Sequence, residues 1–308
     1  MNEFIIPAIT LAFSLIVLAA ASHFTIQRVE DLIELTGLSE VAAGFTILAV
    51  MTSTPEIGVA LFSALEGTPG ISVGDILGSN IFNVGVVVGI IAMFGYFRNC
   101  CTDLMLELTD ILFITSLIPL LLVIFGVASR FVGILLLGIF IFNVYEMSKK
   151  KTPKVDKKDQ PEKKNKALVV IMLIAGIAVV LFSSQFAVSS AHQIAVSLGV
   201  APIAIGAKIV AIGTSLPELA LDLTAARKGR IQLALGDILG SNLTNLTLVL
   251  GLLLVGSPFA VDITVFAGIL PFVLITTLIL WRYLTKGGIS QVGGLLMLMT
   301  YILFQAIL

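Results

Sequence analysis

Two glutamates, Glu56 and Glu218, each follow a proline in the middle of a long apolar stretch. A charged side chain at the centre of a bilayer costs about 2.5–3.5 kcal/mol on insertion scales. Two such residues in equivalent settings need a partner, and a cation is the natural partner for paired carboxylates. Two purely structural carboxylates would lower stability without compensation, so we favour a cation site.

Hydroxyl-bearing residues and a proline precede each glutamate. A proline removes a backbone donor and frees a carbonyl one turn earlier in a helix. Broken helices at membrane depth survive only where they line a cavity or a protein interior. Each block therefore predicts an oxygen-rich kink. The residues of the kinks are Thr52, Ser53 and Pro55 in the first block and Thr214, Ser215 and Pro217 in the second.

Two further blocks read Gly-Asp-Ile-Leu-Gly-Ser-Asn, and another asparagine follows each of them. A serine and an asparagine four residues apart share one helix face, and glycines at this spacing allow another helix to approach closely. The residues are Ser79, Asn83, Gly74 and Gly78 in the first block and Ser241, Asn245, Gly236 and Gly240 in the second.

These blocks belong to an internal repeat with an offset of 162 residues. The offset aligns 44–83 with 206–245 without a gap, and eighteen of the forty positions are identical. Apolar composition alone would not match both Pro-Glu and Gly-Asp-x-x-Gly-Ser-Asn. Together the blocks offer carboxylates, amides and hydroxyls but no His or Cys, which favours a hard cation such as Ca²⁺ over a soft transition metal.

The composition places these blocks in a membrane protein. Of the 308 residues, 58% are hydrophobic and 12% are charged, and the mean hydropathy is +1.10. Soluble domains carry about 45–50% apolar and about 25% charged residues, so an ordinary cytosolic enzyme is excluded. A net charge of -1 argues against a nucleic-acid binder, and the adjacent Cys100 and Cys101 indicate neither a disulfide framework nor a zinc site.

Ten apolar runs approach or exceed the roughly 20 residues that a span needs, and they are continuous rather than alternating. We predict an all-α membrane protein with ten transmembrane helices as two inverted five-helix repeats. The predicted parts are a first repeat at 1–148, a charged cytoplasmic linker at 149–166 and a second, inverted repeat at 167–308. The runs cover residues 4–26, 41–65, 70–97, 104–127, 131–148, 167–190, 200–226, 232–256, 259–283 and 288–308.

The linker at 149–166 holds nine of the eighteen Lys and Arg residues. The positive-inside rule places it in the cytoplasm, and only Arg130 then lies outside, while Lys208 lies within a span. Five spans per half is an odd number, so the second repeat is inverted and both termini are extracellular. Inverted repeats are typical of secondary transporters that bind their substrate near the bilayer midplane.

The four blocks resemble the α-repeats of the sodium/calcium exchanger family, within the cation/calcium antiporter superfamily, and the chain is similar to a minimal prokaryotic-type member. The resemblance implies a central site for Na⁺ and Ca²⁺, with access alternated by the first and sixth helices sliding across the core. It implies Glu56 and Glu218 as central ligands. The remaining implied ligands are Ser79, Asn83, Ser241, Asn245, Thr52, Ser53, Thr214 and Ser215, with the carbonyls of Ala49 and Ala211.

Four polar residues are secondary candidates. Asp75 and Asp237, which often are Asn in relatives, each stand four residues before a site serine and would be ligands on the access path, secondary ligands or proton carriers. Asp222 lies one turn past Glu218. It is either a ligand on the cytoplasmic access path or a residue that simply faces water. Lys208 either snorkels to the outer interface, forms an ion pair with Asp75, or supplies a built-in positive charge that replaces a bound cation.

Departures from the family pattern and acidic residues outside the spans complete the sequence evidence. Many relatives carry Asp where Asn245 stands, so the site charge is lower here. A solvated acidic stretch is expected in the first connection between spans. Its residues are Glu30, Asp31, Glu34 and Glu40.

We therefore predict a secondary antiporter of the cell membrane, and not an enzyme, that exchanges Ca²⁺ for Na⁺ by alternating access. The alternative is a Ca²⁺/H⁺ antiporter using the same glutamates, because burial favours the neutral form of a carboxylic acid. A passive channel has no need of inverted repeats with paired carboxylates. No cofactor is expected; the expected partners are membrane lipid and small inorganic cations, with no nucleic acid, and the oligomeric state is open.

Overall fold

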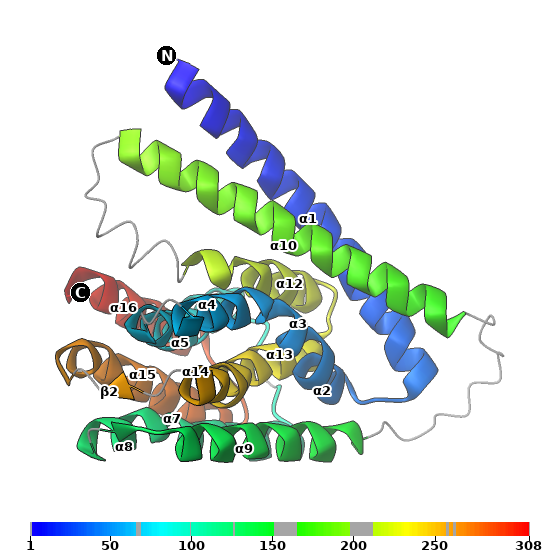
Figure 1. Ribbon diagram of the computed structural model, residues 1–308. Coiled ribbons are helices and arrows are strands. Elements are labelled where there is room, and N and C mark those ends of the chain that lie inside the picture. Colours follow the sequence, from blue (N-terminus) through cyan, green and yellow to red (C-terminus); the bar gives the residue numbers. More distant parts are fainter. Residues whose placement is uncertain are drawn as a thin grey trace.

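The computed structural model is helical almost throughout its described residues (Figure 1). The other regular structure described is one antiparallel strand pair, β1 (Val127–Ala128) with β2 (Phe259–Ala260), in which Val127 lies opposite Ala260. The described residues are 2–65, 69–98, 100–125, 127–150, 165–197, 212–256, 259–260 and 263–307.

The helices of the first half follow the order of the first five predicted spans. Their bounds are α1 (Asn2–Thr36), α2 (Glu40–Ala43), η1 (Gly44–Leu48), α3 (Ala49–Thr52), α4 (Thr54–Leu65), α5 (Pro69–Phe82), η2 (Asn83–Val88), α6 (Gly89–Met93), α7 (Asp103–Ser116), α8 (Ile118–Phe125) and α9 (Arg130–Ser148). The five spans are α1, then α2 to α4, then α5 to α6, then α7 with α8, and last α9.

The second half repeats this order. Its helices are α10 (Lys166–Ser197), α12 (Leu216–Arg227), α13 (Ile231–Thr244), η3 (Asn245–Val249), α14 (Leu250–Gly256), α15 (Ile263–Leu284) and α16 (Gln291–Ile307). α10, α12, α13 with α14, α15 and α16 correspond to the sixth to tenth spans. The predicted all-α layout of ten helices in two repeats is confirmed.

Several spans are interrupted. Among the described residues, five helices are long and apolar enough to cross a membrane unaided, and six if a bent pair counts as one span. In that pair, the segment Glu40–Thr52 meets Thr54–Leu61 at 44°. Interruptions of this kind are tolerated at membrane depth where the backbone is buried in protein or lines a cavity, so they direct attention to the interior.

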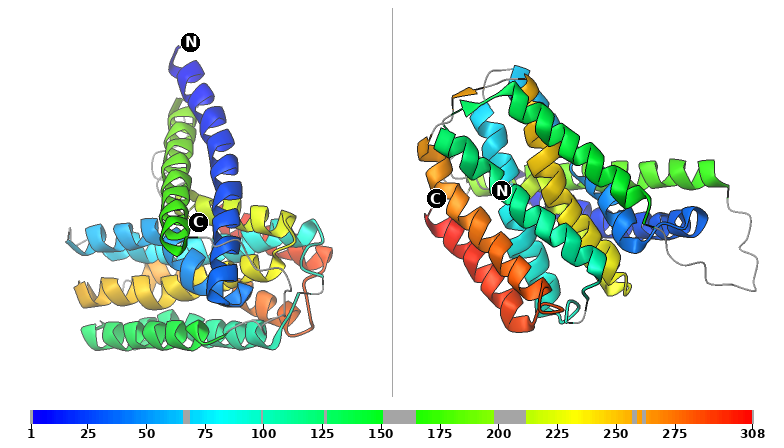
Figure 2. Two further views of the ribbon diagram at one scale, coloured as in Figure 1. Left: turned by 90° about the vertical axis from the view of Figure 1, so that its right-hand side faces the viewer. Right: turned by 90° about the horizontal axis from the view of Figure 1, so that it is seen from below.

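The helices α1 and α10 pack along one another and cross the rest of the bundle obliquely (Figures 1 and 2). The contact is close because Gly176 on α10 has no side chain, and a Cβ there would lie 2.6 Å from Thr25 Oγ1 on α1. The N-terminal part of α1 extends beyond the other helices (Figure 2). These two helices thus form a pair distinct from the layered bundle beneath them.

The helix α1 is longer than its apolar run predicts. The run ends near Ile26, but the helix continues to Thr36, so the expectation that Glu30 lies in a connection was wrong, and likewise for Asp31 and Glu34. Ion pairs support the polar turns, because Arg28 pairs with Asp31 at 2.8 Å. Hydropathy marks the lipid-embedded part of a helix rather than its end.

One arginine joins three elements at this end of the molecule. Arg230, just before α13, pairs with Glu30 on α1 at 3.1 Å and with Glu40 at the start of α2 at 2.8 Å. Lys228 donates to the backbone carbonyl of His23 on α1 at 3.2 Å. The acidic residues Glu30 and Glu40 are therefore partners of Arg230 rather than part of a solvated stretch.

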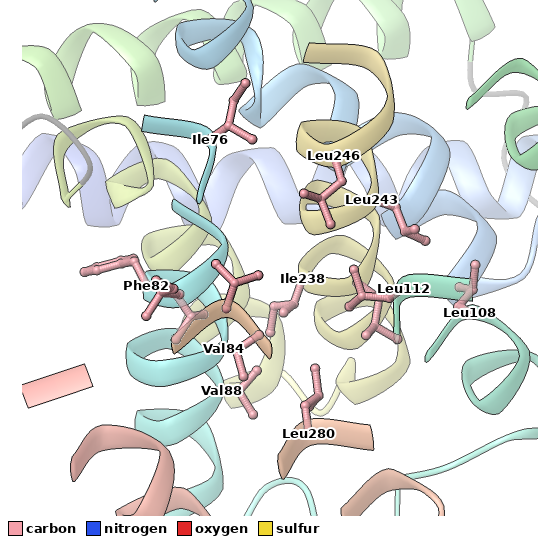
Figure 3. Packing of buried hydrophobic residues seen from close by; sticks show 14 of the residues in the cluster. Ile76, Phe82, Val84, Val88, Leu108, Leu112, Ile238, Leu243, Leu246 and Leu280 are labelled. Atoms are coloured by element: carbon pink, nitrogen blue, oxygen red, sulfur yellow. The ribbon is translucent and has the colours of Figure 1, made fainter. Parts of the chain in front are cut away.

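The buried hydrophobic residues form two clusters. The larger cluster joins α5, η2, α7, α13, η3 and α15, and Figure 3 shows Ile76, Val84, Leu112, Ile238 and Leu280 among its members. The smaller cluster lies where α1 and α10 meet the bundle, and its members include Leu18, Ile26, Val29, Leu173, Ile177, Val180, Leu221 and Leu233. The pair α1 and α10 thus packs on the bundle through an interface of its own.

Polarity is inverted relative to a soluble protein. The outward face of α9 carries Phe131 and Ile141, with 69% and 66% of their surface exposed. The interior helix α13 is buried from Leu233 to Thr244 although it carries Asp237 and Ser241. Polar side chains enclosed by protein with apolar side chains outside are expected of a membrane protein that handles a polar substrate.

Glycines bring α13 against the second span. A Cβ on Gly236 would lie 2.5 Å from the carbonyl oxygen of Val41, and one on Gly240 would lie 2.7 Å from the Cβ of Ala49. The predicted close approach is confirmed at these two positions. At Gly74, a Cβ would meet no described atom within 4 Å; the residue that corresponds to Val41 by the repeat offset is 203, outside the described residues.

Candidate ion-binding site

Both proline-containing blocks break their helices at a serine. Ser53 separates α3 from α4 with φ -75° and ψ 10°, and Ser215 precedes α12 with φ -94° and ψ 6°. The predicted kinks are confirmed, and their matched dihedral angles reflect the internal repeat. The carbonyl that Pro55 frees is that of Met51, and it accepts the Thr54 hydroxyl at 2.7 Å.

The kinks place Glu56 and Glu218 in the first turn of α4 and α12, where the helix dipole favours negative charge. Both side chains are fully buried. None of their four carboxylate oxygens has a hydrogen-bond partner among the described residues. A hydroxyl of the opposite repeat lies beside each glutamate, Thr214 by Glu56 and Thr52 by Glu218.

Hydroxyl pairs connect the two repeats around the glutamates. The hydroxyls of Thr52 and Ser241 hydrogen-bond at 3.3 Å, and those of Ser79 and Thr214 at 3.2 Å. The second pair is the first pair displaced by the repeat offset, because Thr214 corresponds to Thr52 and Ser241 to Ser79. The structure thus joins four of the predicted hydroxyls, two from each half, across the two repeats.

Asparagines make a second symmetric connection. The amide of Asn83 donates to Oδ1 of Asn242 at 3.1 Å, and that of Asn245 donates to Oδ1 of Asn80 at 3.2 Å. The amide of Asn80 also donates to the backbone carbonyl of Asn242 at 3.3 Å. The Oδ1 atoms of Asn83 and Asn245 are left as acceptors without a described donor.

The sequence argument missed Asn80 and Asn242. Each stands directly after a site serine in a block that repeats without change, and this identity was the available signal. The sequence argument instead chose Asn83 and Asn245, because each lies four residues after a site serine. The structure shows that the missed asparagines orient the selected ones, because each accepts a hydrogen bond from the predicted site asparagine of the opposite repeat.

A change of helix type marks the same place in both repeats. The π-helical segments η2 and η3 begin at Asn83 and Asn245. A π-helical turn inside an α-helix is rare and is frequent at functional sites. The backbone irregularity therefore coincides with the residues that turn an acceptor oxygen toward the interior.

The secondary acidic residues border this centre. Asp75 accepts a hydrogen bond from the Thr214 hydroxyl at 3.1 Å, and Asp237 accepts one from Ser241 at 3.5 Å. Asp222 is fully buried on α12. Lys208 and Ala211 lie outside the described residues.

The carbonyl of Ala49, the backbone ligand that the resemblance implies in the first repeat, already accepts hydrogen bonds within its own helix. The Ala49 carbonyl accepts the Ser53 amide at 3.1 Å and the Thr52 hydroxyl at 3.4 Å. Side-chain oxygens therefore dominate the described site.

The unpartnered atoms of the site are mainly carboxylate and amide oxygens, which can accept hydrogen bonds or coordinate a cation. Within the described ranges, no three His, Cys, Asp or Glu residues gather to hold a metal on their own. Carboxylates interspersed with hydroxyl and amide oxygens suit hard cations, which prefer oxygen ligands. Because each element comes from both halves, movement of one half against the other would reshape the site.

Ten helices in two inverted repeats around a buried oxygen-rich centre define a multi-pass membrane antiporter. The family model described as "Sodium/calcium exchanger protein" matches residues 6–148 and 168–308. The chain therefore belongs to the sodium/calcium exchanger family and is a cation antiporter rather than a member of an enzyme family.

Individual relatives agree with this assignment. The chain is 34% identical over 284 residues to the "Putative antiporter CaxA" of Alkalimonas amylolytica, covering 88% of each chain. It is 26% identical over 342 residues to the "Sodium/calcium exchanger MaX1" of Methanosarcina acetivorans, covering 97% of each. The solved structure of the sodium-calcium exchanger NCX_Mj superposes with a TM-score of 0.84 at 25% identity, covering 99% of each chain.

Proposed function

We propose that this antiporter exchanges Ca²⁺ for Na⁺ at the site built around Glu56 and Glu218. The observation that carries the proposal is the set of four buried carboxylate oxygens without a hydrogen-bond partner among the described residues. Two carboxylates neutralise one Ca²⁺, and the surrounding hydroxyls and amides supply the further oxygens that Ca²⁺ coordination requires. The relative from Methanosarcina, named a sodium/calcium exchanger, supports the choice of ions.

The proposed ligands come from both repeats, so that one ion is held between the two halves. Ca²⁺ and Na⁺ share the glutamates and therefore compete, and the halves rearrange only when either ion has neutralised the site. Competition at a shared site is enough to couple the Ca²⁺ flux to the Na⁺ flux, and no second coupling site is needed. The proposed ligands are Glu56, Glu218, Asn83, Asn245, Ser79, Ser241, Thr52, Ser53, Thr214 and Ser215, with the carbonyls of Ala49 and Ala211.

Ca²⁺/H⁺ exchange through the same glutamates is the second candidate. It is favoured by an excess of buried acids, because Asp75, Asp222 and Asp237 join the two glutamates in the interior. One Ca²⁺ neutralises only two of these five carboxylates. Protons are therefore plausible counter-ions, and the pH dependence of Ca²⁺ flux in the absence of Na⁺ separates the two candidates.

Uptake of ⁴⁵Ca²⁺ into proteoliposomes tests the proposal directly. Vesicles are loaded with Na⁺ or with a Na⁺-free buffer over a range of internal pH. We expect uptake that requires internal Na⁺ and falls to background in Glu218→Gln. The control Glu146→Gln removes a half-exposed carboxylate that pairs with Lys149 and should retain uptake. Uptake that ignores Na⁺ but follows the pH gradient would instead establish Ca²⁺/H⁺ exchange.

The orientation is proposed as well, with the linker at 149–166 in the cytoplasm and both termini outside. The excess of Lys and Arg in the linker supports it. A single cysteine introduced at Lys157, with Cys100 and Cys101 replaced by serine, should react with an impermeant thiol reagent only in inverted vesicles. Labelling in intact cells would reverse the assignment.

A further inference from the structure

A second pair of carboxylates lies one helical turn from the central site. Asp222 follows Glu218 by four residues on α12, and Asp237 precedes Ser241 by four residues on α13. Both therefore lie on the side of the central residues that faces the connection between α12 and α13. Their side chains are fully buried and lie beside each other.

This pair lacks a positive partner. Both carboxylate oxygens of Asp222 and Oδ2 of Asp237 have no hydrogen-bond partner within the described ranges. The ion pairs between described residues are made by Arg28, Lys149, Lys150 and Arg230, and they leave out both aspartates. Enclosing two ionised acids side by side without compensation is costly, so either a shared proton or a bound cation must be held between them.

The internal repeat supplies a comparison within the same chain. Asp237 corresponds to Asp75, but the position that corresponds to Asp222 is Ala60, which is also fully buried. The first repeat thus has one aspartate, and Thr214 donates to it. The second repeat has two aspartates, so among the described residues a pair of aspartates exists on one side of the central site and not on the other.

We propose that Asp222 and Asp237 form a second Ca²⁺-binding site between the central site and the α12–α13 connection. Two carboxylates match the charge of one Ca²⁺, and a hard cation takes carboxylate oxygens by preference. The identity of the ion rests on the proposed function, whereas the existence of a separate site rests on the pair itself. The site holds an ion on one side of the exchange centre, which makes the two access routes unequal.

Equilibrium binding of ⁴⁵Ca²⁺ to the purified full chain in detergent tests this proposal. We expect two classes of sites in the unaltered protein. Asp222→Asn, which keeps the size of the side chain, should lose one class, and Asp237→Asn should lose the same class. Glu56→Gln should lose the other class, because Glu56 belongs to the central site. Each variant is assayed as the monodisperse gel-filtration peak, with Glu146→Gln as the matched control.

The outcomes separate the two proposals. Binding that is unchanged in both aspartate variants would overturn the second site and leave a shared proton as the explanation for the pair. Loss of both classes in Asp222→Asn would also overturn it, because the aspartate would then belong to the central site. Glu56→Gln that binds Ca²⁺ like the unaltered chain would instead contradict the central site and leave the second site standing.

Discussion

Each site asparagine is oriented by a residue of the opposite repeat, so the centre exists only when the two halves pack together. Asn242 accepts from Asn83, and Asn80 accepts from Asn245, at nearly equal distances. The carboxylates of Glu56 and Glu218 in contrast have no described donor. The residues that position ligands are thus satisfied, while the acceptors proposed for the ion are not, which is the arrangement expected of a preorganised site.

The asparagine network predicts matched losses in the two repeats. Asn242→Ala leaves the Asn83 amide without its acceptor, and Asn80→Ala does the same to Asn245. A buried donor left without a partner costs about 1–3 kcal/mol. We expect both variants to lower the thermal unfolding temperature in detergent by similar amounts and to weaken Ca²⁺ binding.

Asn143 provides the control for this prediction. It is buried on α9, and its amide has no hydrogen-bond partner among the described residues. Asn143→Ala should therefore cost less stability and leave Ca²⁺ binding unchanged. A loss in Asn143→Ala as large as in the two network variants would show that burial, rather than the network, sets the cost.

At the scale of the elements, kinks and close helix contacts place the ligands. The break at Ser53 turns the second span by 44°, and this bend points the first turn of α4 into the interior. The helix α13 passes so close to the second span that Gly236 meets the backbone of Val41. Ser241, one and a half turns further along α13, can reach Thr52 only because of that contact.

The glycine contact predicts that alanine is harmful at Gly236 but tolerated at Gly138, which is exposed on α9. In Gly236→Ala the new Cβ would lie 2.5 Å from the Val41 carbonyl oxygen, so the helices must separate. Overpacking of this kind costs about 1–3 kcal/mol. In Gly138→Ala, on the exposed face of α9, the Cβ meets no described atom within 4 Å, and alanine favours a helix by up to about 1 kcal/mol over glycine.

Thermal unfolding in detergent and Na⁺-dependent Ca²⁺ uptake measure both variants. We expect Gly236→Ala to unfold at a lower temperature and to transport poorly, while Gly138→Ala unfolds at the same or a higher temperature. Equal destabilisation of the two variants would contradict the contact as the reason for glycine at 236.

Elements with a local cause could be predicted from sequence, and those with a distant cause could not. The kinks at Ser53 and Ser215 follow from prolines two residues later, and the repeat follows from matched Gly-Asp-x-x-Gly-Ser-Asn blocks. The continuation of α1 to Thr36 depends in part on Arg230, which lies 200 residues away from its partner Glu30. The role of Asn242 likewise depends on a partner in the other repeat, which no local pattern reveals.

For the whole molecule, the separation of two hydrophobic clusters divides the chain into a helix pair and a bundle. The interface between them is apolar, with Leu18 and Ile177 on the pair and Leu221 on the bundle. Apolar surfaces lack directional bonds and permit sliding, whereas the described polar contacts from α1 to the bundle gather at one end, where Glu30 meets Arg230. This arrangement predicts that α1 and α10 move together across the bundle during transport (Figure 2).

Two cross-links distinguish motion within the pair from motion against the bundle, both in a chain with Cys100 and Cys101 replaced by serine. Thr25→Cys with Gly176→Cys joins α1 to α10, where the short approach suits a disulfide. We expect this link to leave Na⁺-dependent Ca²⁺ uptake in place. Glu30→Cys with Arg230→Cys, bridged by a short bifunctional thiol reagent, joins α1 to the bundle and should reduce uptake to background.

The same double variants before cross-linking are the controls, because each lacks the native side chains but not the freedom to move. Loss of the two ion pairs that Arg230 makes with Glu30 and Glu40 should change stability little, since exposed pairs contribute about 0–1 kcal/mol each and the Arg230 side chain is 42% exposed. Uptake should therefore persist until the reagent is added and return if a cleavable reagent is reduced. If Na⁺-dependent Ca²⁺ uptake is unchanged while positions 30 and 230 are cross-linked, then access alternates without movement of the helix pair α1 and α10 against the bundle.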